Sequence, residues 1–223
     1  MSNKYGPRIV TDGLVLCLDA ADRNSYPGSG STWYDLKGNH NATVTGGSPT
    51  YRNLYGGVFD FDGTDDYMTI SDPGSLNTFS VAVWVYPLLN STGDAPSIIA
   101  SKYPSYVNFQ ITYLNNNTVR MGIFNGAWAW PNFVSVNNGW QHLCFTYDGP
   151  SSALILYRNG VGIISIVSNI TAFSSGTGIH IGRRWDIANY FNGYISKIEL
   201  HNRALSPDDV VQNYNATKGR FGL

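Results

Sequence analysis

WQHLCFTYDG, residues 140–149, followed by LYRNG, residues 156–160, decides the fold of this chain. The first stretch is an apolar and aromatic run that ends in an Asp-Gly turn signal. The second ends in Asn-Gly between apolar residues, and this dipeptide tolerates the positive φ that a type I′ hairpin turn requires. Together they predict short antiparallel strands joined by tight turns, with a hairpin at residues 158–161.

Runs of the same kind recur through the chain, and Gly and Asn turn signals separate them. Many short strands with this spacing are typical of a β-sandwich or barrel. We therefore expect an all-β chain, folded as an antiparallel β-sandwich of the jelly-roll type. Segments 19–57 and 125–138, rich in Gly, Ser, Asn and Pro, are expected to be long loops. The other runs lie at residues 14–18, 58–61, 67–70, 79–86, 97–101, 109–113, 119–124, 154–158, 161–166, 179–182 and 194–200.

Two of these runs carry information about burial. Residues 79–86 are apolar on both faces, so we expect a central strand that is covered on both sides. In residues 194–200, alternation places Lys197 and Glu199 on one face together with Ile195. This pattern predicts a strand with one face in solvent.

One short helix is expected near the C-terminus. Ser206 is suited to the N-cap, Pro207 to the first helical position, and the two aspartates that follow favour the positive end of the helix dipole. The helix should run for about two turns and end by Ala216.

The composition limits the partners that this chain can have. Of its 223 residues, 43% are hydrophobic, but only 13% are charged and the net charge is −1. A weakly charged surface rich in Asn, Ser, Thr, Gly and Tyr suits sugars, protein interfaces or symmetric assembly, and it argues against nucleic acid. The N-terminus is polar and no apolar run reaches 18 residues, so we expect neither a signal segment nor a membrane partner.

Two cysteines, Cys17 and Cys144, lie inside apolar runs. We interpret them as buried thiols that act as small hydrophobic side chains, with a disulfide as the alternative.

The order and spacing of these pieces resemble the laminin-G-like, concanavalin A-like lectin/glucanase family. The resemblance extends from about residue 12 to residue 217. It implies a concanavalin A-like sandwich in which the strand at 194–200 pairs with the N-terminal strand at 14–18. The domains expected are an N-terminal arm at 1–12, the sandwich at 13–217 and a C-terminal tail at 218–223. The stretches that carry the resemblance are FDFDGTDDY at 59–67, the Trp-bearing run at 79–87, residues 140–149 and residues 156–160.

The two ends carry a narrower resemblance, to the version of this domain seen in virion proteins of tailed phages, those of marine cyanobacteria in particular. It implies a non-catalytic virion structural protein, made in the host cytoplasm, that decorates a capsid or forms part of a tail fibre. Its partners would be capsid or tail proteins of the same virion, in a homo-oligomer or symmetric assembly. The matching stretches are GLVLCLDAAD at 13–22, SYPGSG at 25–30, TWYDL at 32–36 and NYNATKGRFGL at 213–223.

Catalysis is disfavoured by the acidic residues. The glucanase branch of the resembled family uses a Glu-x-Asp-x-Glu strand, whereas this chain has one glutamate, Glu199. Asp60 and Asp62 could share a face of a strand, but Asp62-Gly63 is better interpreted as a turn. No nucleophile-elbow motif, zinc-ligand spacing or phosphate-binding loop is present in the sequence. We expect a protein that is not an enzyme, and a glycoside hydrolase is the least favoured function.

Calcium is the one cofactor that the sequence suggests. Carboxylate and amide oxygens are the ligands that Ca²⁺ prefers, and Asp35, Asn39 and Asn41 share one loop while Asp65 and Asp66 are adjacent. The alternative is that these side chains cap turns. Relatives in the resembled family often carry an acid after Gly-x-Ile, where this chain has Ser196, and that difference weakens the case.

Aromatic side chains in three expected loops form the candidate binding surface. Flat rings beside Asn and Asp suit sugars, because a ring stacks on C–H groups while polar groups bind hydroxyls. The alternative function is therefore a lectin-like module that binds host-surface polysaccharide. The competing interpretation is that these rings anchor loops or fill a protein interface. The residues are Trp128, Trp130, Phe133, Tyr103, Tyr106, Arg184 and Trp185.

Overall fold

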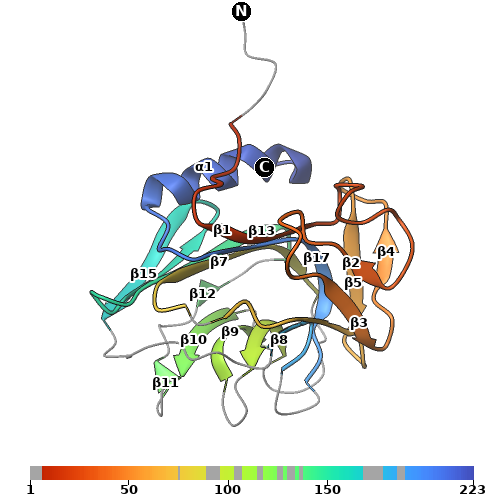
Figure 1. Cartoon of the computed structure of the whole chain (residues 1–223), viewed down its shortest axis with the longest axis horizontal. Helices are drawn as coiled ribbons and strands as arrows, with labels where there is room; N and C mark the ends of the chain where they lie inside the picture. The colour runs from red at the N-terminus through yellow and green to blue at the C-terminus, as the bar shows by residue number, and fades with distance from the viewer. Residues whose placement is uncertain are drawn as a thin grey trace, which may run out of the picture.

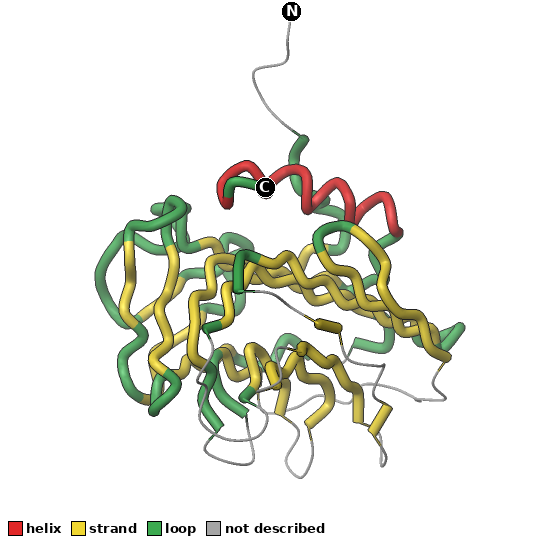
Figure 2. The backbone as a smooth tube through the Cα atoms, turned by 180° about the vertical axis from the view of Figure 1, so that it is seen from behind, coloured by secondary structure: helices red, strands yellow, loops and turns green. Residues whose placement is uncertain are grey.

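Two antiparallel β-sheets face each other across a hydrophobic core, and helix α1 (Pro207–Thr217) lies on the outside of one of them (Figure 1). The expected antiparallel β-sandwich with one C-terminal helix is thus confirmed. The structure is a computed structural model that describes residues 7–74, 76–88, 96–102, 107–114, 118–124, 128–129, 134–135, 138–167, 178–184 and 189–223. Seen from behind, the helix again lies above one layer of strands, with the second layer on the far side (Figure 2).

Sheet A is the layer that carries the helix. Its strand order is β15-β14-β13-β7-β17-β5-β4, and β1 also pairs with β17. The expected pairing of the N-terminal strand with the last strand is confirmed, with Leu18 opposite Ile198. The strands are β1 (Leu14–Asp19), β4 (Thr50–Arg52), β5 (Val58–Asp62), β7 (Phe79–Pro87), β13 (Gln141–Asp148), β14 (Ala153–Arg158), β15 (Val161–Val167) and β17 (Asn192–His201).

Sheet B forms the opposite layer. Its strand order is β11-β10-β9-β8-β16-β6-β3-β2, and β12 also pairs with β10. The strands are β2 (Thr32–Trp33), β3 (Ala42–Gly46), β6 (Tyr67–Ile70), β8 (Ser97–Lys102), β9 (Val107–Leu114), β10 (Thr118–Phe124), β11 (Trp128–Ala129), β12 (Val134–Ser135) and β16 (Gly178–Ile181).

The core lies between the sheets because every second side chain of each strand points inward. Phe79 of β7 contacts Phe145 on the neighbouring strand of sheet A, with ring centroids 5.7 Å apart, and Phe109 of sheet B at 5.5 Å. All three rings are at most 2% exposed. Burial of one such side chain contributes about 1.5–3 kcal/mol, so aromatic contacts across the layers hold the sandwich together.

Local signals in the sequence have the expected structural outcomes at the hairpin and at the helix. Asn159 and Gly160 adopt φ of 51° and 81°, which confirms the type I′ turn. Helix α1 (Pro207–Thr217) begins after Ser206, whose hydroxyl accepts the backbone N–H of Asp209 in a capping box. It has 11 residues, about one turn more than predicted, and continues as the 3₁₀ helix η1 (Lys218–Phe221).

Two predictions about loops and solvent are wrong. The expected loop at 19–57 contains β2, β3 and β4, and the one at 125–138 contains β11 and β12. These strands have two to five residues and lie toward sheet edges, too short for a visible alternation. The face of β17 that carries Lys197 and Glu199 is not in solvent, because these residues are 5% and 3% exposed. A bulge at Ser196 also changes the alternation, so Ile195 points into the core.

The cysteines are buried and free, as predicted. Burial raises the pKa of Cys17 to about 12, so this thiol stays protonated and unreactive at neutral pH. Among the described residues, no helix combines the length and the apolar character needed to span a bilayer.

Candidate functional site

The outer face of sheet A is covered by the chain's own C-terminus, and we call the covered part the closed face. It consists of Ala82, Trp84, Cys144, Tyr157, Lys197 and Glu199, which lie under α1 and η1. The ring of Phe221 in η1 stacks on Trp84 at 4.1 Å. The indole N–H of Trp84 donates to the hydroxyl of Thr217 at 2.8 Å. An outer strand face that would otherwise meet water is therefore a second, smaller core.

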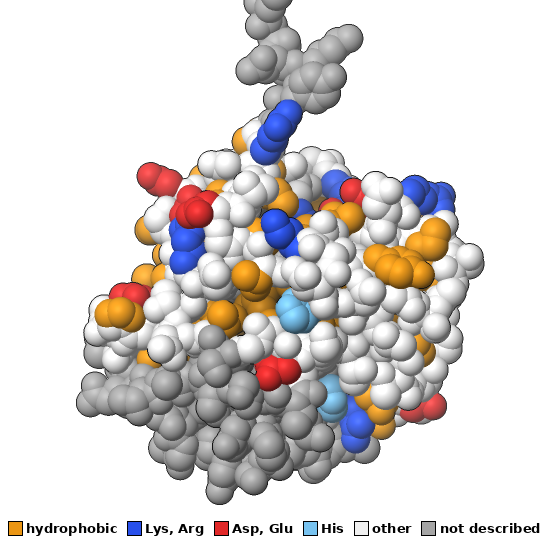
Figure 3. All heavy atoms as spheres, in the orientation of Figure 1, with side chains coloured by type: hydrophobic (Ala, Val, Ile, Leu, Met, Phe, Trp, Pro, Cys, Tyr) orange, Lys and Arg blue, Asp and Glu red, His pale blue; other side chains and the backbone are white. Residues whose placement is uncertain are grey.

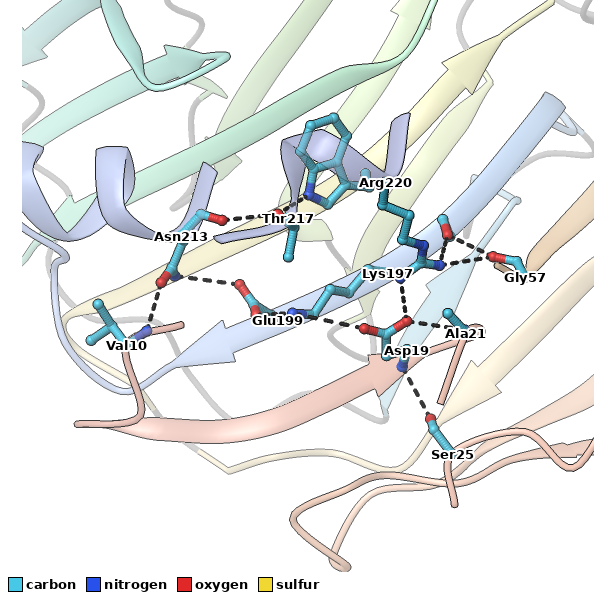
Figure 4. A network of polar contacts seen from close by, with 12 residues as sticks. Val10, Asp19, Ala21, Ser25, Gly57, Lys197, Glu199, Asn213, Thr217 and Arg220 are labelled. Atoms are coloured by element: carbon cyan, nitrogen blue, oxygen red, sulfur yellow. Dashed lines mark hydrogen bonds and ion pairs between the residues drawn. The ribbon is translucent and has the colours of Figure 1, made fainter. Parts of the chain in front are cut away.

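A buried ion pair lies beneath the helix (Figure 4). Nζ of Lys197 is 2.8 Å from a carboxylate oxygen of Glu199 and 3.9 Å from Asp19. Burial alone would raise the pKa of Glu199, but the Lys197 ammonium outweighs that effect and holds the pKa below its usual value. Asn213 of α1 donates to Glu199 at 3.4 Å and accepts the backbone N–H of Val10 at 2.7 Å. The network thereby joins the N-terminal segment to the C-terminal helix.

Arg220 ties the tail to the sandwich. Its guanidinium donates to the carbonyl of Tyr55 at 2.6 Å, to the carbonyl of Gly57 at 2.9 Å and to Asp19 at 2.6 Å. It also contacts the hydroxyl of Ser196, the residue that stands where relatives of the resembled family often carry an acid. At the position where relatives often carry an acid that could bind a metal, this chain has the hydroxyl of Ser196, which is bound to Arg220.

The outer face of sheet B, which we call the polar face, has a different character. Strand register places Thr43, Thr69 and His180 side by side on three neighbouring strands. Thr69 and His180 are half-buried, and Thr43 is exposed. The polar face comprises Thr43, Thr45, Tyr67, Thr69, Gln110, Thr112, Arg120 and His180.

An aromatic and cationic group stands at one side of the polar face. The ring of Tyr67 lies 5.7 Å from the imidazole of His180 and 6.3 Å from the ring of Tyr190. The guanidinium carbon of Arg183 is 4.8 Å from the centre of the Tyr67 ring and 5.6 Å from that of Tyr190. All four side chains are half-buried, so they present rings and hydrogen-bonding groups to the same region of surface.

Farther along the polar face, buried polar groups have unused hydrogen-bonding capacity. Gln110 and Thr112 are 1% and 0% exposed. Within the part of the chain that the structure describes, neither amide atom of Gln110 nor the hydroxyl of Thr112 has a hydrogen-bond partner. Buried polar groups of this kind are normally satisfied by protein or water. At this burial they cannot contact a ligand, so the accessible part of the polar face is the threonine row beside Tyr67 and His180.

The aromatic residues predicted as a binding surface belong to segments that connect strands of sheet B or follow one of them. Trp128 was expected in a loop, but it lies in β11, where its backbone pairs with Phe124. Arg184 follows β16 and is half-buried. The remaining five lie outside the described residues: Tyr103, Tyr106, Trp130, Phe133 and Trp185.

An acidic cluster lies at the corner where the two sheets meet. Asp62 at the end of β5, Asp65 and Asp66 each have a carboxylate oxygen within 4.8 Å of the others. Burial raises the pKa of Asp66, and the neighbouring carboxylates of Asp62 and Asp65 raise it further. The oxygens of Asp66 also accept the backbone N–H groups of Ser48 and Asp62. Three close carboxylates match the oxygen chemistry of Ca²⁺, and these residues could hold one.

The other loop considered for calcium uses its carboxylate internally. Asp35 is 5% exposed, and its oxygens accept backbone N–H groups from Cys17, Asn39 and other residues of its loop at 2.8–3.1 Å. The side-chain oxygen of Asn41 accepts the N–H of Asp35 at 2.9 Å. In this geometry Asp35, Asn39 and Asn41 organise the loop and attach it to β1.

Comparison with known proteins identifies similar sequences and folds. Residues 62–211 match a family model described as the concanavalin A-like lectin/glucanases superfamily. No curated protein matches the chain. Domain 4 of AbnA, a GH43 extracellular arabinanase from Geobacillus stearothermophilus solved in complex with arabinotriose, is similar with a TM-score of 0.71 and 22% identity. The match covers 90% of this chain and 98% of that one.

Larger proteins contain the same fold. The receptor binding domain of botulinum neurotoxin C/D mosaic serotype matches with a TM-score of 0.69 and 16% identity, over 92% of this chain and 51% of that chain. Trypanosoma rangeli sialidase in complex with the inhibitor DANA matches with a TM-score of 0.68 and 14% identity, over 93% and 33%. This chain spans about half of the toxin domain and a third of the sialidase. At these identities the similarity establishes the fold alone.

Proposed function

Because the chain belongs to the concanavalin A-like lectin/glucanase superfamily, we propose that it is a non-catalytic module that binds glycan through the polar face. The observation that carries the proposal is the half-buried group of Tyr67, His180 and Arg183 beside the threonine row of sheet B. Rings can stack on the C–H faces of a sugar while hydroxyl and imidazole groups bind its hydroxyls.

The placement of Glu199 and Asp60 supports a non-catalytic role. Glu199 lies under α1 in an ion pair with Lys197, and a carboxylate in that position cannot reach a substrate. Asp60 forms an ion pair with Arg52 at 2.5 Å. A glycosidase needs two carboxylates facing one glycosidic bond, so a binding role is the better interpretation.

Similar structures support a binding role. Domain 4 of the arabinanase was solved with arabinotriose, and the toxin domain is described as receptor binding. The surface of this chain also suits glycan. In the view of Figure 3, most of the described surface is neutral and the charged side chains are scattered.

A glycan array tests this function. We expect the parent protein to bind at least one polysaccharide, and Tyr67→Ala to weaken that binding by about tenfold through loss of stacking. Tyr34→Ala is the matched control, because Tyr34 is an exposed tyrosine outside the polar face. Absence of binding by the parent, or equal binding by Tyr67→Ala, would remove the proposal.

We also propose that the module is carried on a virion, as a capsid decoration or tail-fibre part. The resemblance of residues 13–36 and 213–223 to phage virion proteins motivates this setting, and the placement of both end segments supports it. Arg8 and Val10 hydrogen-bond to Gln212 and Asn213 of α1, so both ends lie on the sheet A side (Figure 1). A tether at either end would leave the polar face pointing outward.

Antibody labelling of purified phage particles from the source culture tests the virion setting. We expect label on capsids or tails. Analytical ultracentrifugation of the isolated protein would reveal the expected homo-oligomer. Label confined to the soluble fraction would contradict the setting and leave glycan binding untouched.

A further inference from the structure

A row of aromatic residues crosses the outer face of sheet A beyond the end of the closed face. Strand register places Asp60 of β5, Tyr194 of β17 and Tyr86 of β7 directly opposite one another. Trp140 precedes β13 and packs against Tyr86, with ring centroids 5.8 Å apart. Since neighbouring strands lie about 4.8 Å apart, the row from β5 to β13 extends roughly 14 Å.

The rings in this row form a continuous surface, which we call the aromatic shelf and define as Tyr55, Tyr86, Trp140 and Tyr194. The ring centroid of Trp140 lies 5.3 Å from that of Tyr55 and 5.8 Å from that of Tyr86, and the Tyr86 and Tyr194 centroids are 5.8 Å apart. Tyr55 is 45% exposed, and Tyr86 and Tyr194 are half-buried, so these three rings meet solvent. Trp140 is 6% exposed and is buried between Tyr55 and Tyr86.

The C-terminal tail supports the shelf from one side. The ring of Phe221 lies 4.5 Å from Trp140 and 6.2 Å from Tyr55. Arg220 holds the backbone at Tyr55 through its carbonyl. The tail therefore positions Tyr55 and Trp140 before any ligand arrives, which lowers the entropy cost of binding.

The rim of the shelf is polar and electrically balanced. Arg52 and Asp60 form an ion pair at 2.5 Å, with side chains 49% and 18% exposed. The indole nitrogen of Trp140 is buried and has no hydrogen-bond partner among the described residues. Rings that bind C–H faces, together with a rim of zero net charge, match an uncharged sugar better than an ionic ligand.

We infer that the aromatic shelf is a second carbohydrate site, specific for uncharged oligosaccharides. It lies on sheet A, whereas the polar face lies on sheet B, so the sandwich would bind glycan on both of its outer faces. The inference goes beyond the proposed function and is independent of the residues that carry it.

Isothermal titration with three uncharged trisaccharides, namely arabinotriose, maltotriose and cellotriose, tests the shelf. We expect the parent to bind at least one of them and Tyr194→Ala to weaken that binding about tenfold. Tyr194→Phe keeps the ring and should stay within about threefold of the parent. Arg52→Ala is a second variant that removes an exposed rim side chain and leaves the core intact. Tyr67→Ala is the control on the polar face and should leave this binding unchanged.

The outcomes separate the two sites. If Tyr194→Ala and Arg52→Ala both bind as the parent does while Tyr67→Ala loses binding, the shelf is overturned and the proposed function stands. If only the shelf variants lose binding, the shelf is supported as the site for these three sugars, and the glycan array remains the test of the polar face. If the parent binds none of the three sugars, the shelf inference is overturned, while the proposed function still depends on the array. If the parent self-associates and Tyr194→Ala abolishes that association, the shelf is an interface between copies of the chain, and the inference of a sugar site is overturned.

Discussion

The closed face and the polar face are both outer surfaces of antiparallel sheets, yet only the closed face is covered by α1 and the C-terminal tail. On sheet A, Lys197 and Glu199 are almost fully buried, although their alternation with core residues is typical of a strand face in water. On sheet B, Thr43 and Thr69 occupy equivalent outward positions and remain accessible. The difference is that α1 and the tail pack on one sheet. Alternation therefore reports which residues point away from the core, and the rest of the chain decides whether they meet solvent.

The largest expected effect comes from breaking the buried ion pair. Lys197→Met should lower the free energy of unfolding by about 3–5 kcal/mol, because Glu199 is left as an uncompensated buried charge. Urea denaturation measures the change. Thr69→Ala on the polar face is the control, and a loss below about 1 kcal/mol in Lys197→Met would mean that the closed face does not exclude water.

Removal of the aromatic cap should have the next largest effect. Phe221→Ala deletes a 6% exposed ring that stacks on Trp84, and should cost about 3 kcal/mol of unfolding free energy. Leu223 belongs to the same tail and is 48% exposed, so Leu223→Ala should change the free energy of unfolding by less than about 0.5 kcal/mol. Thermal melts of the two variants compare them directly, and equal melting temperatures would contradict the packing of the tail.

Acid should weaken the closed face through His142 of β13, whose buried ring lies beside it, 5.2 Å from Trp84 and 6.1 Å from Tyr214 of α1. Burial lowers the pKa of this imidazole to about 4, so the folded protein takes up a proton less readily than the unfolded chain. The stabilisation is complete above the unfolded pKa of about 6.5 and is lost as pH falls toward 4, on the order of 2–3 kcal/mol. Urea denaturation at pH 7 and pH 4.5 measures the loss.

His142→Leu provides the matching test, because it removes the titrating group. We expect a smaller difference in unfolding free energy between pH 7 and pH 4.5 than in the parent. His40→Gln, a substitution outside the closed face, is the control. An unchanged pH dependence in His142→Leu would assign the acid sensitivity to other groups.

Calcium should stabilise the fold by binding to the acidic cluster at the corner where the two sheets meet. If Asp62, Asp65 and Asp66 hold Ca²⁺, millimolar CaCl₂ should raise the stability by about 1–2 kcal/mol over a chelator-treated sample. Asp65→Asn should abolish that increase by removing one charge from the cluster. Differential scanning calorimetry measures both, and an unchanged melting temperature in the parent would exclude the site.

The smallest expected effect on stability belongs to the polar face. Thr69→Ala should change the free energy of unfolding by less than about 0.5 kcal/mol, since its side chain is half-buried and outside the core. The same variant should weaken glycan binding if sugar hydroxyls contact the threonine row. Chemical denaturation and the glycan array together separate the two effects, and a large destabilisation would show that this face is structural.

Much of the fold could be predicted because it depends on local chemistry. Asn159-Gly160 adopts the positive φ values of its turn, and Ser206-Pro207 starts the helix, since both signals act within a few residues. The short strands β2 and β11 were missed, because two residues carry no alternation. The bulge at Ser196 was missed as well, since it depends on contacts with Gly57 and Arg220, distant in sequence.

The candidate sites could be predicted only in part. Asp65 and Asp66 were visible as adjacent acids, and Asp62 joins them because the corner between β5 and β6 folds back on itself. No binding motif in the sequence marked Tyr67 or Tyr194 as a candidate. Each became a candidate through its cross-strand neighbours, His180 in one case and Tyr86 in the other, and strand register is a tertiary property.

By itself, the sequence determined the sandwich, the hairpin at 158–161, the position of the helix and the presence of a single glutamate. These follow from periodicity, turn chemistry and composition, which act within short windows or on the chain as a whole. Only the tertiary structure decided which outer face is closed, because that depends on where α1 packs. The helix packs on sheet A, where Trp84 stacks on Phe221 and Glu199 meets Lys197 and Asn213. On the outer face of sheet B, Thr43 and Thr69 remain accessible.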